Sequence, residues 1–312
     1  MIVFPEIKTM FDLYEKFKRE QWNASELDYG SHGETGDITG DYGPTWIDLS
    51  KVPSLQGLLP EERSLFIAEH AWLALCTSIQ GEDFAARTAA SEAEEVPDRD
   101  ARAALSMQTV DEVRHYEAGM RVLTHRYRDR EFVYLRARDQ RWKAFLARGY
   151  MEKLIGLHIV TEGLAMGRFK NREVHSPDPV IRDMYRRINV DEARHTALGM
   201  LYISHSIKEM PETERRQLEE FTFERILEDY RMYTDKMFDP DLCRRVGLDA
   251  LTLTQEVRRL GLDDIVRVEL NRRVMPKIKV LGLLPDRLLP QYRKHEFFVD
   301  SRIPPTAQMR PT

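Results

Sequence analysis

Two short segments decide how this sequence is read: Asp111-Glu112-Val113-Arg114-His115 and Asp191-Glu192-Ala193-Arg194-His195. Both have the pattern Asp-Glu-x-Arg-His, and each lies in a stretch whose apolar spacing predicts a helix. Residues i and i+3 share one face of a helix, so each segment can present a carboxylate oxygen and an imidazole nitrogen to one metal ion. Two such segments on different helices predict two metal ions.

In helical bundles, a dinuclear carboxylate site takes one further glutamate from each of two other helices. Glu82 lies 30 residues before Glu112, and Glu162 lies 30 residues before Glu192. The equal spacing indicates that one helix pair has been used twice, and both glutamates are flanked by apolar residues and a glycine. The predicted metal ligands, which are also the predicted catalytic residues, are therefore Glu82, Glu112, His115, Glu162, Glu192 and His195.

Other acidic residues in the same region fit the site less well. Glu69 lies thirteen residues before Glu82, or about 20 Å along a helix axis, and cannot reach the same layer. Glu92, Glu94 and Glu95 form an acidic run before a proline, and we expect them to face water.

The remaining residues of the two segments are expected to support the ligands. A ligating histidine usually donates its second ring N–H to a carboxylate, so Asp111 and Asp191 are candidates, either within their own helix or across to the opposite histidine. Arg114 and Arg194 can neutralise these aspartates. His158, four residues before Glu162, is compatible with a seventh ligand, a donor in the pocket or a core histidine.

The composition predicts an all-α protein. Of 312 residues, 42% are hydrophobic and 32% charged, a balance that suits long amphipathic helices. We expect one domain with an N-terminal arm (1–58), a metal-binding bundle (60–208) and a C-terminal helical extension and tail (210–312). The arm should hold a separate helix at 8–21 and an irregular connection at 29–48, and 276–312 should form a surface tail. Periodicity and punctuation predict the other helices at 60–95, 98–127, 130–147, 150–172, 178–208, 212–236, 240–259 and 262–274.

Charge and cysteine content exclude several classes of protein. The 47 basic and 52 acidic residues give a net charge of −5, which argues against binding nucleic acid. Cys76 and Cys243 offer neither a disulfide framework nor a Cys-based zinc site. No segment resembles a signal peptide or approaches the roughly 18 apolar residues of a membrane span. We therefore expect a cytoplasmic protein that does not bind membranes.

Four helices that supply Glu, E-x-x-H, Glu and E-x-x-H resemble the ferritin-like di-iron carboxylate superfamily. The paired D-E-x-R-H form resembles its oxygenase branch, especially the iron-bearing subunit of bacterial multicomponent monooxygenases. These monooxygenase subunits, ribonucleotide reductase small subunits and R2-like oxidases have an N-terminal segment similar to Leu13-Tyr14-Glu15-Lys16, Gln21-Trp22-Asn23 and Glu26-Leu27-Asp28. The resemblance implies a four-helix bundle with additional terminal helices, two iron ions or a Mn/Fe pair, and O₂ as co-substrate. We expect as partners a small-molecule substrate, a ferredoxin or reductase that donates electrons, and a second copy in a homodimer.

The chain departs from the individual branches at single positions. Gly119 stands where radical-type reductases carry a tyrosine, Ala85 and Leu157 where R2-like oxidases form a crosslink, and Met166 where methane and toluene monooxygenases carry a threonine. The leading interpretation is a di-iron oxygenase that hydroxylates, epoxidises or N-oxygenates a small apolar or aromatic compound. The alternatives are an oxidase or radical generator of the R2 type and a ferroxidase or peroxide scavenger. The residues expected to line the substrate cavity are Ile79, Ala86, Gln108, Leu157, Thr161, Ala165 and Met166.

Overall fold

The computed structural model describes residues 7–30, 47–128 and 130–297. Every regular element within these ranges is a helix, and they contain no strand. The prediction of an all-α protein is therefore confirmed. Most of the predicted irregular connection (31–46) and the last residues of the predicted tail (298–312) lie outside the described residues.

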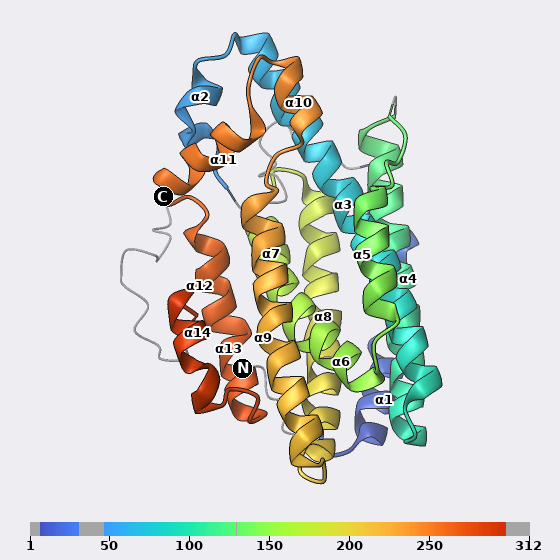
Figure 1. Ribbon diagram of the computed structural model, residues 1–312. Helices are drawn as coiled ribbons and strands as arrows, with labels where there is room; N and C mark the ends of the chain where they lie inside the picture. Colours follow the sequence, from blue (N-terminus) through green and yellow to red (C-terminus); the bar gives the residue numbers. More distant parts are fainter. Residues whose placement is uncertain (1–6, 31–46, 129, 298–312) are drawn as a thin grey trace.

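Four long helical segments form the centre of the molecule (Figure 1). They are α3 (Pro60–Glu95), α4 (Arg99–Arg126), the composite segment α6 (Tyr150–Leu154), η4 (Ile155–Thr161) and α7 (Glu162–His175), and α8 (Pro179–Ser206). Helix α3 packs along α4, and α7 packs along α8. Short turns connect the helices of each pair, and the side chains of Asp98 and Asp178 cap the second helix by accepting from Ala101 N and Val180 N.

The other helices surround this bundle. Helix α9 (Glu212–Asp235) and α12 (Asp264–Arg273) pack against the segment that contains η4 and α7. The remaining elements are η1 (Ala24–Glu26), η3 (Leu49–Lys51), α2 (Pro53–Gln56), α5 (Arg136–Leu146), α10 (Pro240–Arg245), α11 (Ala250–Arg259), α13 (Met275–Val280), η5 (Asp286–Leu288) and α14 (Leu289–Lys294).

The helix of the N-terminal arm packs against the bundle. Helix α1 (Met10–Arg19) packs against α4 and α8. Its apolar face is fully buried at Leu13 and Phe17, and the Phe17 ring stacks on His195 with 5.8 Å between centroids. The arm therefore covers one end of the predicted metal site.

Three predicted helical stretches differ from the structure. The stretch 130–147 becomes helical only at Arg136. The stretch 240–259 breaks into α10 and α11, because Gly247 adopts a φ of +72°, which ends a helix. The stretch 150–172 contains the π-helix η4, and the predicted surface tail contains α13 and α14.

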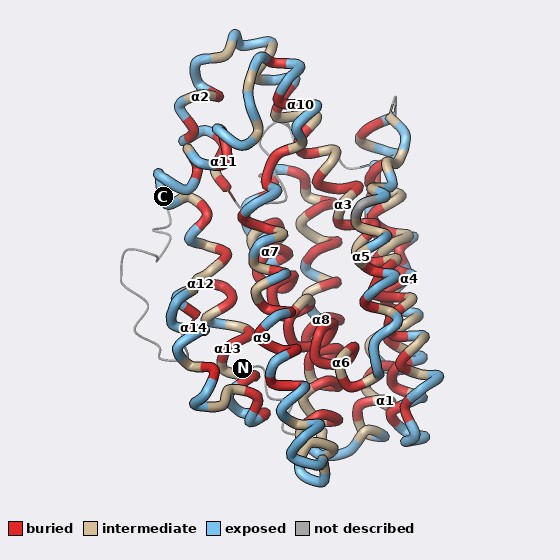
Figure 2. The backbone as a smooth tube through the Cα atoms, viewed as in Figure 1, coloured by how far each residue is buried: buried red, intermediate tan, exposed pale blue. Residues whose placement is uncertain are grey.

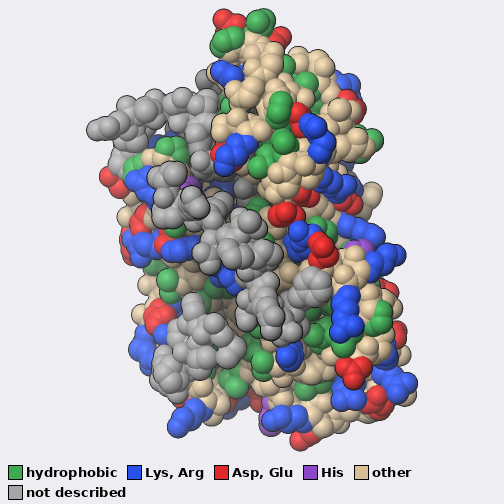
Figure 3. Space-filling model, turned by 90° about the vertical axis from the view of Figure 1, so that its left-hand side faces the viewer, with side chains coloured by type: hydrophobic (Ala, Val, Ile, Leu, Met, Phe, Trp, Pro, Cys, Tyr) green, Lys and Arg blue, Asp and Glu red, His purple; other side chains and the backbone are tan. Residues whose placement is uncertain are grey.

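The faces of the central helices that meet are buried, as Figure 2 shows. Charged side chains of both signs are interspersed on the face drawn in Figure 3. Cys76 and Cys243 are buried free thiols. Within the described ranges, no helix combines the length and the apolar character needed to span a bilayer.

Candidate metal centre

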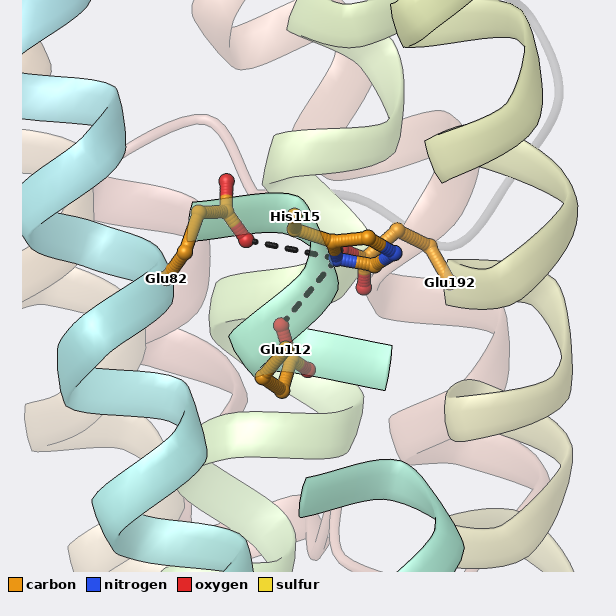
Figure 4. Close-up of side chains that lie close together, drawn as sticks. All are labelled: Glu82, Glu112, His115 and Glu192. Atoms are coloured by element: carbon orange, nitrogen blue, oxygen red, sulfur yellow. Dashed lines mark hydrogen bonds and ion pairs between the residues drawn. The ribbon is translucent and has the colours of Figure 1, made fainter. Parts of the chain in front are cut away.

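The six predicted ligands converge in the middle of the bundle. Glu82, Glu112, His115 and Glu192 offer ligand atoms within 4.8 Å of one another, and so do Glu112, Glu162, Glu192 and His195. Figure 4 shows the first group, with Glu82 on α3, Glu112 and His115 on α4, and Glu192 on α8. All six side chains are buried. The two groups share Glu112 and Glu192, which is the arrangement expected of carboxylates lying between two ions.

The two halves of the site are nearly symmetric. Nδ1 of His115 lies 3.2 Å from Glu112 Oε2 and 3.5 Å from Glu82 Oε2. Nδ1 of His195 lies 3.1 Å from Glu112 Oε1, 3.5 Å from Glu192 Oε2 and 3.7 Å from Glu162 Oε1. Each imidazole therefore turns Nδ1 toward the carboxylates, as a metal-binding nitrogen must.

The donor set fits two cations. Among the described residues, three buried atoms at the centre have no well-aligned hydrogen-bond partner: Glu162 Oε2, Glu192 Oε2 and His195 Nδ1. Burial raises the pKa of Glu82 and of Glu192 to about 7, and raises the pKa of Glu162 well above its ordinary value. Four carboxylates at this depth need positive charge to stay ionised. Carboxylates with imidazoles are ligands that iron and manganese accept, so the residues suit a dinuclear metal centre.

The supporting aspartates act across the bundle. Nε2 of His115 lies 2.9 Å from Oδ2 of Asp191, and Nε2 of His195 lies 3.3 Å from Oδ2 of Asp111. Each aspartate thus contacts the histidine of the other helix, which selects one of the two arrangements left open by the sequence. Burial opposes ionisation of Asp191, but the hydrogen bond from His115 and the charges of the nearby arginines hold its pKa below the ordinary value.

Both arginines of the motifs join these aspartates. Arg114 donates to Asp111 Oδ1 at 2.5 Å and to Asp191 Oδ2 at 2.9 Å. Arg194 donates to Asp191, and to Asp111 Oδ2 at 3.2 Å. Two buried carboxylates and two guanidiniums therefore form one network that fixes both imidazoles, and Arg194 extends it by donating to Glu20 Oε2 at 3.0 Å.

The N-terminal segment supplies two residues that sequence reasoning did not assign to the site. Trp22 Nε1 donates to Asp191 Oδ2 at 2.7 Å, and Gln21 Nε2 donates to Asp111 Oδ1 at 2.9 Å. The indole also lies over the Arg114 guanidinium, 4.8 Å from its carbon. The sequence feature that could have indicated their role is the Gln21-Trp22 pair itself, because it lies in the segment that resembles the R2 proteins.

His158 contacts Glu92 most closely and lies at the edge of the cluster, with its Nδ1 3.8 Å from Glu162 Oε2. Its Nε2 lies 2.8 Å from Glu92 Oε2, and its Nδ1 lies 3.2 Å from the carbonyl oxygen of His195. Both ring nitrogens therefore have a partner. The expectation that Glu92 faces water is wrong: its side chain is fully buried, because α3 extends across the face of α6 and η4 that carries His158. Glu94 and Glu95 are exposed, as expected.

A cavity of about 60 Å³ adjoins the site, a volume that corresponds to about two water molecules. Glu82, Glu112, Glu162 and Glu192 all contribute to its wall. Of the residues predicted to line it, Leu157, Thr161 and Ala165 do so. Ile79, Ala86, Gln108 and Met166 do not line this cavity; Gln108 instead donates to Glu162 Oε1 at 2.8 Å.

The π-helix η4 ends directly before Glu162. Such wide turns are rare and occur mostly at functional sites. The Thr161 hydroxyl closes the last turn by donating to Gly156 O at 2.8 Å. The wider turn rotates the following residues about the helix axis relative to a regular α-helix. Glu162, the first residue after it, lies in the carboxylate layer. No side-chain pattern in 150–172 distinguishes a π-helix from an α-helix.

No protein-family model matches the sequence, and no curated protein is significantly similar to it. Solved structures do match. The dimanganese(II) NrdF of Streptococcus sanguinis is 13% identical with a TM-score of 0.59, over 91% of this chain and 93% of that chain. An R2-like ligand-binding oxidase mutant with an anaerobically reconstituted Mn/Fe cofactor is 18% identical with a TM-score of 0.58, over 90% and 95%. The chain therefore has the ferritin-like fold in its R2-like form.

Proposed function

We propose that this chain, built on the R2-like ferritin fold, binds two iron ions or a Mn/Fe pair and uses O₂ to oxidise a small organic molecule. One observation carries the proposal: two ligand groups share Glu112 and Glu192, and each group contains one histidine. Four carboxylates and two imidazoles leave coordination positions open on two ions.

Each ligand has a place in this arrangement. Glu82 and His115 would hold one ion, Glu162 and His195 would hold the other, and Glu112 and Glu192, which belong to both groups, would contribute to both. When bound, the metal ions supply the reduction of O₂ and the oxidising power for the substrate. The protein keeps Nδ1 of both histidines directed at the ions through Asp111 and Asp191, and it surrounds the site with buried side chains.

We propose oxygen insertion, by hydroxylation, epoxidation or N-oxygenation, as the reaction. The cavity supports this, because it reaches Glu112, Glu162 and Glu192 while apolar side chains such as Phe84 and Leu157 form part of its wall. Ala85 and Leu157 both line the cavity, and neither can form the crosslink expected of R2-like oxidases. Two electrons for each turnover would come from a ferredoxin or reductase.

An R2-like two-electron oxidase is the second candidate, because the structural neighbours include such oxidases. A radical-type reductase subunit is disfavoured by packing. A Cβ atom built on Gly119 would lie 2.7 Å from Ile79 Cγ1, so the position expected to carry a tyrosine has no room for a side chain.

Metal content and reaction with O₂ test the proposal. The purified protein should bind close to two metal ions per chain. After reduction, mixing with O₂ should give a transient visible absorption band whose decay accelerates when a substrate is present. One ion or none would contradict the dinuclear site. Continuous turnover of added Fe²⁺ without substrate would instead indicate a ferroxidase. Light scattering should give the mass of the homodimer that we expect.

A further inference from the structure

Three arginines line the cavity beside the proposed metal site: Arg138 on α5, Arg168 on α7 and Arg225 on α9. Arg225 has anionic and neutral partners. It lies 2.7 Å from Asp229 Oδ1 and donates to Thr161 Oγ1 at 2.9 Å. Its charge is therefore neutralised within the protein.

Arg168 has no such partner. Its side chain is buried, with 8% of the residue exposed, and it packs against two aromatic rings. The guanidinium carbon lies 5.1 Å from the centroid of Phe169 and 5.8 Å from that of Tyr233. Within the described ranges, no carboxylate or carbonyl oxygen accepts a hydrogen bond from it. A cation–π contact gives none of its N–H donors an oxygen acceptor.

Arg138 is also without a carboxylate among the described residues. It donates to Thr77 O at 3.1 Å and lies 3.3 Å from Met232 Sδ. Burial, together with the nearby charges of Arg168 and Arg141, lowers its pKa to about 10, so it remains cationic at neutral pH. The cavity wall therefore holds two guanidiniums that form no ion pair with a carboxylate of the described residues, although the more distant charge of Asp229 partly stabilises Arg138.

For the buried Arg168, a charge without a counter-ion is costly, and a ligand can supply the missing anion. Arginine binds carboxylates in a planar, two-point arrangement, with two parallel N–H to oxygen bonds. Arg168 follows Glu162 by six residues on one helix, which places it about 9 Å farther along the axis. Phe84, Trp142 and Ala165 also line the cavity and give it an apolar wall.

We propose that the cavity binds an organic acid whose carboxylate is held by Arg168 and Arg138 and whose apolar chain or ring extends toward Glu162. The inference rests on the proposed function, because it takes the apolar end as the part that is oxidised. It replaces a wholly apolar substrate by one whose anionic head group is held about 9 Å, or roughly 1.7 helical turns, farther along the axis of α7 than Glu162.

The partly exposed residues of the cavity wall mark the entrance to the cavity. Thr77, Arg138 and Met232 are neither buried nor fully exposed, and they lie on α3, α5 and α9. Because the cavity as it stands holds about two waters, an acid must displace flexible side chains as it enters. Met232 and Arg138 are the long, flexible side chains at this entrance.

The test compares octanoate with octanamide by calorimetric titration of the full-length, metal-loaded protein. The two probes have the same chain length and differ in charge. Octanoate should bind at least about tenfold more tightly, as a charge-assisted, two-point contact predicts. Arg168→Gln should remove this preference, and Arg138→Gln should reduce it. Arg121→Gln is the matched control, since Arg121 is partly exposed and pairs with Glu117 on α4.

Several outcomes would overturn the inference. One is that both arginine variants retain the preference, because the carboxylate is then bound by the metal ions or elsewhere. Another is that octanoate, decanoate and 3-phenylpropanoate all fail to bind. If Arg168→Gln does not fold, Arg138→Gln decides the result. Testing the metal-loaded protein for reaction with O₂ separates the two proposals: an arginine-dependent preference for octanoate in a loaded protein that does not react with O₂ would support the acid site and reject the oxygenase.

Discussion

Nε2 of His115 on α4 lies 2.9 Å from Oδ2 of Asp191 on α8. This contact joins the two Asp-Glu-x-Arg-His segments, because the aspartate of one segment orients the histidine of the other. The same oxygen accepts from Trp22 Nε1 and from Arg114. One carboxylate therefore links the N-terminal segment, both motif helices and the proposed ligand His115.

Asp191→Asn should weaken metal binding without unfolding the protein. The amide keeps the volume but loses the negative charge that His115, Arg114 and Arg194 contact, and loss of such a support typically lowers metal affinity about 10- to 100-fold. Competition with a chelator for bound Mn²⁺ measures the change. Asp183→Asn on the same helix is the control, because Asp183 pairs with exposed Arg186. Equal affinities in the two variants would refute the role given to Asp191.

Glu112→Gln should lower the metal content from about two ions per chain to one or none. Glu112 belongs to both ligand groups, so its loss should affect both ions, whereas Glu82→Gln should affect mainly one. Elemental analysis of the purified variants distinguishes these outcomes. Glu117→Gln, at a partly exposed position on the same helix, should retain both ions. Two tightly bound ions in Glu112→Gln would show that it does not lie between them.

The sequence was sufficient to predict the four-helix architecture and the convergence of the six proposed ligands. Helical periodicity and the paired motifs can be read from short stretches of sequence. The equal spacing of Glu82 and Glu162 from the motif glutamates then identifies the two remaining ligands. The sequence also predicts that Arg114 and Arg194 lie beside the aspartates. It does not predict that these contacts cross between α4 and α8.

The remaining features depend on packing between distant segments. Glu92 lies in an acidic run that reads as solvent-facing, and only its contact with His158, 66 residues away, makes it a buried partner. The contact of Trp22 with Asp191 depends likewise on how the segment after α1 packs on the bundle. The surroundings of Arg168 depend on α9, which supplies Tyr233. No side-chain pattern in this segment predicts the π-helix η4, which is defined by its backbone geometry.

Gly119→Ala should destabilise the protein by about 1–3 kcal/mol, the usual cost of overpacking a core. The new Cβ would lie 2.7 Å from Ile79 Cγ1. Gly81→Ala is the matched comparison, since a Cβ there meets nothing within 4 Å and alanine favours a helix by up to about 1 kcal/mol. Urea unfolding measures both changes. Equal stability of the two variants would contradict the close packing that excludes a tyrosine at position 119.

Glu92→Ala should destabilise the protein by about 3 kcal/mol or more, because it leaves His158 buried without its partner. Glu94→Ala, two residues away on an exposed position, should change the stability by less than about 0.5 kcal/mol. The free energies of unfolding in urea test this contrast. A similar small effect of both substitutions would mean that Glu92 contacts water and that the His158 pair contributes nothing.

The metal-free protein should lose stability as the pH rises from about 5 to 8. The pKa of Glu82 and of Glu192 is raised from 4.5 to about 7 by burial, so between these values the folded state holds protons that the unfolded state has released. The slope of stability against pH is then negative, and two shifts of this size amount to several kcal/mol, on the order of 1.4 kcal/mol for each pKa unit. The raised pKa values of His115 and His195 act in the same direction.

Metal binding requires the ionised carboxylates and so becomes tighter as pH rises, which should reverse the trend in the loaded protein. Urea unfolding at several pH values, with and without Mn²⁺, measures both slopes, and parallel slopes would contradict the assignment of these glutamates as ligands.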